Sequence, residues 1–132
     1  MNPIAQIFKK GSYPDLMNKN SLFSKCAAEF LGVFVILFLG CGSLMISSRF
    51  PGSIHAELPA VIFGFAVMIM IYSVGHISGA HFNPAVTLAF AAARHFPLRQ
   101  VIFYWIAQIS GAFAAIYFLT QMLPAGTDFG AV

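Results

Sequence analysis

A helix start lies inside a hydrophobic stretch of this chain, at a point where an ordinary membrane span would simply continue. Asn83 is a strong N-cap residue, because its side-chain oxygen can accept a hydrogen bond from the first backbone N–H groups of a helix. Pro84 has the backbone angle of the first helical position. The ten residues 84–93 are compatible with a helix, and at about 1.5 Å per residue they span roughly half of a hydrocarbon core of about 30 Å. The sequence therefore predicts a short helix that begins near the middle of the membrane.

Composition places the chain among membrane proteins. It is 59% hydrophobic and 8% charged, with a mean hydropathy of +0.83, which excludes an ordinary soluble domain. Its 132 residues make one domain at most. The net charge of +3 comes from scattered lysines and arginines rather than from a run, so we interpret it as a topology signal and not as a nucleic-acid-binding surface.

Three apolar runs predict full membrane spans, at residues 26–46, 58–74 and 101–123. Tyr104 and Trp105 lie near the start of the third run, where aromatic rings commonly anchor a helix at the membrane interface. We therefore expect an all-α membrane protein with three transmembrane helices and one half-helix between the second and third.

The lysines and arginines predict the orientation of these spans. Residues 1–24 form a polar, basic leader without the cleavage site of a signal peptide, so we expect a retained tail. Six lysines and arginines lie on the side of this tail, whereas Arg49 alone lies on the other side. The positive-inside rule then places the N-terminus in the cytoplasm and residues 124–132 outside. The half-helix would enter from the cytoplasmic side and return to it.

The segment before the half-helix predicts a pore lining. Irregular backbone at membrane depth is tolerated only where it is buried in protein or lines a water-filled cavity. We expect residues 78–82 to be extended, with the carbonyls of Gly79, Ala80 and His81 as acceptors for water or a small polyol. Asn83 would offer an amide donor, and the positive end of the helix dipole would oppose cations and protons.

This segment resembles the aquaporin and glycerol-facilitator family, also called major intrinsic proteins. The matching residues are the signature Asn83-Pro84-Ala85, the preceding run from Val74 to His81, and the run Ala28-Glu29-Phe30-Leu31-Gly32, which looks like the family's first transmembrane helix. Within the family, residues 72–76 and 94–101 look most like the nodulin-26-like branch. The resemblance implies passive transport of water or neutral solutes such as glycerol, tetrameric assembly, and no catalytic residue or cofactor.

The resemblance also assigns a role to Glu29, the one ionisable residue well inside the first span. A charge at membrane depth usually faces the protein interior with a partner, and the resemblance favours a buried brace for residues 78–82 and His81. The alternative is an interfacial carboxylate near Lys25, since Glu29 lies only a turn inside the membrane. Both interpretations stay open from the sequence.

Four further side chains receive roles in the same way. His76 would line the cytoplasmic vestibule, and His81 would contact the loop, because neither has a Cys or carboxylate at the spacing of metal ligands. Phe63 matches the position that the second span contributes to the family's aromatic/arginine selectivity filter, with a packed or lipid-facing ring as the alternative. Val86 would border the pore, with simple packing as its alternative.

The chain departs from the family in carrying one repeat. Complete members contain two inverted repeats, each with its own signature, whereas this chain holds only an N-terminal repeat, residues 25–123, and nothing in residues 124–132 resembles a second signature or the filter arginine. Uncovered backbone costs several kcal/mol per group in lipid. We therefore expect the repeat to need a partner, either a second-repeat polypeptide or a full-length relative. An inverted homodimer is disfavoured by the charge bias.

Two hypotheses follow. The first is a channel polypeptide that forms a pore with its other half. The second is a truncated, non-conducting membrane subunit that associates with full-length relatives. A membrane enzyme is disfavoured, because no polar nucleophile and base are spaced so as to face each other. The sequence leaves the solute open.

Overall fold

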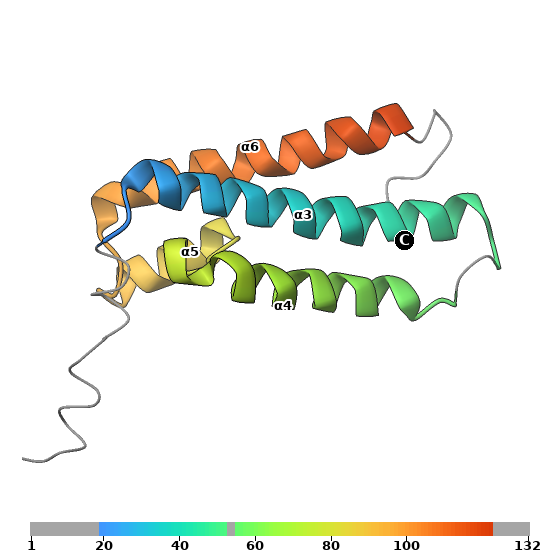
Figure 1. Ribbon diagram of the computed structural model, residues 1–132, viewed down its shortest axis with the longest axis horizontal. Helices are drawn as coiled ribbons and strands as arrows, with labels where there is room; N and C mark the ends of the chain where they lie inside the picture. The colour runs from blue at the N-terminus through green and yellow to red at the C-terminus, as the bar shows by residue number, and fades with distance from the viewer. Residues whose placement is uncertain (1–18, 53–54, 123–132) are drawn as a thin grey trace, which may run out of the picture.

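The structure, a computed structural model, describes residues 19–52 and 55–122 of the chain (Figure 1). Within these ranges its regular secondary structure is all helix, which confirms the predicted class. The helices, labelled as in Figure 1, are α3 (Leu22–Arg49), α4 (Leu58–Ser78), α5 (Pro84–Ala92) and α6 (Leu98–Met122). The predicted C-terminal end, residues 124–132, lies outside the described residues, as does the tail before Lys19.

Three of these helices, α3, α4 and α6, are long and apolar enough to cross a membrane. Each is longer than its predicted span. Helix α3 begins at Leu22, inside the predicted tail, because the Ser21 side chain caps it by accepting from the Ser24 N–H at 3.1 Å. Helix α6 begins at Leu98, directly after Pro97.

The second span continues four residues beyond its predicted end at Val74, so Ser78 is helical and not part of an extended segment. Between Val74 and Gly79, Gly75 is the only residue that disfavours a helix. Gly79 then ends α4 in the left-handed conformation, with φ 93°. The Gly79 N–H bonds to the Gly75 carbonyl at 2.9 Å. The non-helical segment is therefore residues 79–83.

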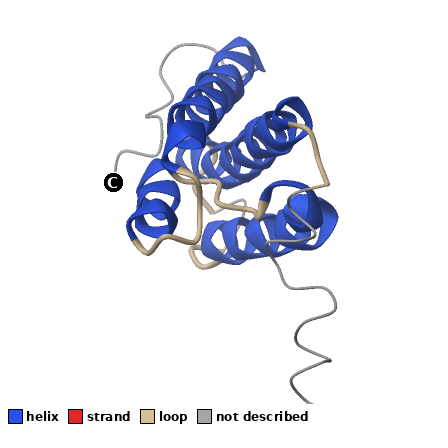
Figure 2. Cartoon of the chain, turned by 90° about the vertical axis from the view of Figure 1, so that its left-hand side faces the viewer, coloured by secondary structure: helices blue, strands red, loops and turns tan. Residues whose placement is uncertain are grey.

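The three long helices run side by side, with α3 packed against both α4 and α6 (Figure 1). Helix α5 packs against α6, and in the described residues α4 and α6 stay apart along most of their length and meet at the end of α4, where Tyr104 bonds to Ser78. Seen from the end in Figure 2, the helices surround the loop that leads into α5. This arrangement leaves a space between α4 and α6, with α5 beginning beside it.

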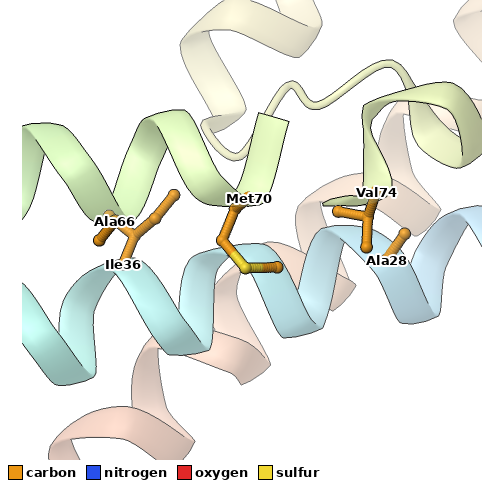
Figure 3. Packing of buried hydrophobic residues seen from close by; sticks show 5 residues of the cluster. All are labelled: Ala28, Ile36, Ala66, Met70 and Val74. Carbon is orange, nitrogen blue, oxygen red and sulfur yellow. The ribbon is translucent and has the colours of Figure 1, made fainter. Parts of the chain in front are cut away.

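Small side chains let α3 and its neighbours approach closely. The α3–α4 contact is built on Ala28, Ile36, Ala66, Met70 and Val74 (Figure 3). On the other side of α3, a Cβ atom added to Gly111 of α6 would lie 2.5 Å from the backbone oxygen of Phe30. Close helix packing through small residues is the usual way to associate helices in a membrane, where the hydrophobic effect between helices is absent.

Candidate functional site

The half-helix starts where the sequence predicts. Asn83 is the N-cap of α5, and its Oδ1 accepts from the Ala85 N–H at 2.8 Å. Pro84 occupies the first helical position. The nine residues of α5 reach about 14 Å, close to half of a hydrocarbon core. The helix dipole therefore points its positive end at the middle of the bundle.

The segment leading to Asn83 has an unusual backbone. Ala80 and Phe82 have φ angles of 51° and 48°, in the left-handed region that side-chain-bearing residues rarely adopt. Each such residue costs roughly 1–2 kcal/mol. The conformation therefore needs specific contacts to hold it.

Glu29 supplies those contacts. Its side chain is fully buried, and its Oε1 accepts from the Ser78 hydroxyl at 2.7 Å and the His81 N–H at 2.9 Å. Its Oε2 accepts from the Phe82 N–H at 2.7 Å and from Gln108 Nε2 at 2.8 Å. A carboxylate offers about four lone-pair sites, and all four face donors. The carboxylate is thus enclosed by donors from Ser78, His81, Phe82 and Gln108 and is not exposed.

Thr87 forms a second junction, one helical turn into α5. Its hydroxyl donates to the Asn83 carbonyl at 3.1 Å and accepts from Gln108 Nε2 at 3.0 Å. His81 Nδ1 lies 3.1 Å from the same oxygen. Gln108 therefore links Glu29 on α3 to Thr87 on α5, and the loop is tied to three helices.

Aromatic rings enclose the His81 side chain, which is buried. Its ring stacks on Phe90 at a centroid distance of 4.7 Å, makes an edge contact with Phe96 at 4.9 Å, and lies tilted against Tyr104 at 5.3 Å. The structure thus places His81 against the loop, α5 and α6. His, Cys, Asp and Glu side chains form no group of three or more that could hold a metal ion in the described part of the chain.

The prediction that Tyr104 and Trp105 anchor α6 at the membrane interface is wrong, because their polar atoms bond to the protein backbone. Tyr104 is fully buried, and its hydroxyl donates to the Ser78 carbonyl at 2.8 Å. Trp105 Nε1 donates to the Pro84 carbonyl at 3.0 Å. Both residues hold the loop and the first turn of α5, since buried O–H and N–H groups need a partner.

A cavity of about 500 Å³ lies between α4 and α6, beside the start of α5. It brings together several of the predicted site residues: Phe63, Ala80, His81, Asn83, Pro84 and Val86. The remaining wall is mostly aliphatic, with Gln108 as a further polar member. The combination of an apolar wall, one line of polar backbone and a few polar side chains suits a small neutral molecule.

The other predicted residues lie around this cavity or away from it. Phe63 is 40% exposed and packs its ring where a Cβ on Gly40 would lie, so it combines a lining position with helix packing. Gly79, just before the lining segment, and Ala85, within it, are not part of the cavity wall. His76 is exposed near the end of α4, and its carbonyl accepts from Asn20 Nδ2 at 3.3 Å.

Sequence reasoning missed the supporting residues Ser78, Thr87, Gln108, Tyr104 and Trp105 as members of one network. Gln108 carried a usable signal, because a polar residue inside an apolar span usually faces a protein interior. Thr87 carried no such signal, since a threonine in a short helix can bond to its own backbone or face solvent.

Comparisons with known proteins agree with this geometry. The family model for major intrinsic proteins matches residues 16–131. Aquaporin NIP1-1 of Oryza sativa subsp. japonica is 48% identical over 115 residues, covering 79% of this chain and 40% of that protein. Aquaporin NIP1-1 of Zea mays is 51% identical over 88 residues, covering 67% of this chain and 31% of that protein. The resemblance to the nodulin-26-like branch is thereby confirmed.

A solved structure gives the same result for the fold. The aquaglyceroporin from Plasmodium falciparum matches with a TM-score of 0.69 at 30% identity, covering 77% of this chain and 42% of that chain. The chain spans about two fifths of the length of the first of these relatives. Sequence and fold together lead to one conclusion: this chain belongs to the major intrinsic protein family of membrane channels and is similar to the N-terminal part of its nodulin-26-like aquaporins.

Proposed function

We propose that the chain is the N-terminal repeat of a channel for water or small neutral solutes such as glycerol, and that it forms its pore together with a second repeat. The observation that carries this proposal is the braced backbone of residues 79–83, which is left-handed at Gly79, Ala80 and Phe82 and lies beside a cavity at the start of a half-helix. Lipid cannot satisfy such a backbone. Water or solute molecules in the cavity can use the carbonyls of this backbone as acceptors and the Asn83 amide as a donor.

The exclusion of protons and other cations follows from the same geometry. The positive end of α5 faces the cavity, and the backbone supplies dipoles rather than charges. Glu29 is nearby but its oxygens are occupied by four donors, so it offers no free carboxylate to a passing cation. Phe63 and Val86 would narrow the passage as apolar side chains on its wall.

The need for a partner follows from the open side of the cavity. Exposed apolar side chains continue from the cavity wall over α4 and α6, among them Ile71 and Ile109. A second repeat, either as a separate polypeptide or from a full-length relative, would cover these faces. We further propose a cytoplasmic N-terminus in the plasma or cytoplasmic membrane, from the lysine and arginine distribution, and tetramers, which the family resemblance implies.

The test is solute-driven volume change in proteoliposomes. The chain is reconstituted alone and together with a polypeptide that carries the C-terminal part of the rice Aquaporin NIP1-1. We expect water or glycerol flux from the pair, loss of flux in Asn83→Asp, and normal flux in Gln121→Glu, a matched charge change at the far end of α6.

Each other outcome rejects part of the proposal. Flux from the chain alone, lost in Asn83→Asp, would show that the repeat needs no second-repeat partner. Flux from the pair that is indifferent to Asn83→Asp would remove the half-helix from the pore. Absence of flux from a well-inserted pair, together with co-purification of the chain with a full-length relative, would favour the non-conducting subunit.

A further inference from the structure

Two glycines of α3 leave space for aromatic rings that line the cavity. A Cβ atom built at Gly40 would overlap Phe63 Cδ2 and lie 2.8 Å from Phe63 Cε2, a separation that real Cβ atoms do not show. A Cβ atom built at Gly32 would overlap the ring of Phe82 and lie 2.7 Å from its Cζ. Both glycines are buried, and both phenylalanines belong to the cavity wall. A side chain at either position of α3 would therefore displace a ring that lines the cavity.

The register of α3 against α4 explains why Gly40 and Phe63 meet. The two helices run antiparallel (Figure 1), and Ile36 of α3 lies close to Ala66 of α4 (Figure 3). Gly40 is one turn further along α3 than Ile36, and Phe63 is one turn before Ala66 on α4. Residues three or four apart lie on the same face of a helix. The Gly40–Phe63 contact therefore continues the packing between the two helices by one turn.

Phe63 lies at a different level of the cavity from the braced loop. Gly32 and Gly40 are eight residues apart, so the rings that they contact are separated by about 12 Å along α3. The Phe82 backbone N–H is bonded to Glu29, which ties this residue to the brace. A phenylalanine side chain has no polar group to bond, so packing alone sets the position of the Phe63 ring. Gly40 is one of the surfaces against which that ring packs.

We propose that Gly40 is a positioning residue for solute selectivity, because it sets how far the Phe63 ring extends into the passage. This inference rests on the proposed channel function. Helices α3 and α4 occupy two sides of the ring, so a ring pushed off α3 turns toward the cavity or toward its open side, where the second repeat would complete the passage. Side chains occupy a few staggered rotamers, and an overlap this close requires a change of rotamer. The displaced ring impedes glycerol more than water, because glycerol is larger.

The test compares water and glycerol flux in proteoliposomes that carry the chain together with the C-terminal part of the rice Aquaporin NIP1-1. We expect Gly40→Ala to lower the glycerol-to-water flux ratio by about tenfold, since one methylene in an apolar pocket alters discrimination by at least that much. Gly64→Ala is the control and should leave the ratio unchanged, because it adds the same methyl group next to Phe63 in the sequence with no atom within 4 Å.

A second pair of variants tests whether Gly40 acts through the ring. Phe63→Ala should raise the glycerol-to-water ratio, because it removes the ring from the wall. Adding Gly40→Ala to Phe63→Ala should change the ratio no further, since no ring is left to displace. A role of Gly40 in helix packing alone would give the same effect with and without the ring.

The outcomes separate this inference from the proposed function. An unaltered pair that conducts neither solute rejects the proposed function and this inference with it. A conducting pair in which Gly40→Ala leaves the ratio unchanged, matches Gly64→Ala, or acts equally without the Phe63 ring rejects this inference alone. If Gly40→Ala does not fold, the double variant should fold and Phe63→Ala should still raise the ratio. Failure of either expectation rejects the positioning role.

Discussion

Replacing Glu29 with glutamine keeps the shape of the site but changes its hydrogen-bonding character. A carboxylate is an acceptor at both oxygens, whereas an amide has one accepting oxygen and one NH2 group. In the structure Oε1 serves Ser78 and His81, and Oε2 serves Phe82 and Gln108. Whichever way the new amide turns, its NH2 group faces two donors that lose their acceptor.

The cost of the change can be worked from these contacts. Each buried donor left without a partner costs about 1–3 kcal/mol, so two of them cost about 2–6 kcal/mol. Gln108 can reduce the cost, because its Oε1 has no partner in the described residues and its amide can turn to accept from the new NH2 group. The Phe82 N–H cannot turn in this way, since it is part of the backbone. We therefore expect Glu29→Gln to destabilise the chain by at least about 1–3 kcal/mol.

The assay is unfolding of the detergent-solubilised chain by titration with sodium dodecyl sulfate. Trp105 is the only tryptophan and bonds to the first turn of α5, so its fluorescence reports the packing of the half-helix. Glu57→Gln is the matched control, because Glu57 is exposed and its side chain makes no cap bond to α4. An effect of Glu29→Gln no larger than that of the control, which should stay within about 0.5 kcal/mol, would refute the brace.

Three other substitutions test the packing by the same titration. Gly111→Ala should destabilise the chain by about 1–3 kcal/mol, because the new Cβ meets the Phe30 backbone oxygen. Gly64→Ala is the control and should be neutral or stabilising, since no atom lies within 4 Å of its new Cβ. Equal effects of the two substitutions would contradict the close α3–α6 contact. Arg94→Gly should stabilise by about 0.5–1 kcal/mol, since Arg94 has a φ of 61° after the end of α5; a loss of stability would show that its charge outweighs the strain. Trp105→Phe, followed by circular dichroism, should cost about 0.5–1.5 kcal/mol through loss of the bond to the Pro84 carbonyl, and an unchanged midpoint would reject that bond.

The half-helix could be predicted because its start depends on local chemistry. Asn83 and Pro84 are an N-cap and a first helical residue in any surroundings, and the structure has them in these positions. The end of α4 was predicted four residues too early for the opposite reason. Ser78 remains helical while its hydroxyl bonds to Glu29, 49 residues away in the chain, and such long-range contacts leave no mark on the local sequence.

The supporting network shows the same limit, with one exception. Gln108 and Glu29 are 79 residues apart, so their pairing cannot be derived from either neighbourhood. Their shared orientation could have been predicted, however. The buried residues of α6 include Tyr104, Gln108, Gly111, Ala115 and Leu119, which recur at steps of three and four and therefore share one helix face. That stripe already marks Tyr104 as interior and argues against an interfacial anchor.

Several contacts that shape residues 79–83 come from within the described part of this chain. Glu29, Thr87, Gln108 and Tyr104 hold the segment from three helices, so the proposed second repeat is not required to form the left-handed conformations within it. What the chain leaves open is one side of an apolar cavity. Substitutions in the network should therefore act on the folding of the chain alone, whereas polar substitutions on the exposed faces of α4 and α6 should act on assembly and flux. A network variant that folds normally alone but fails only when paired would contradict this division.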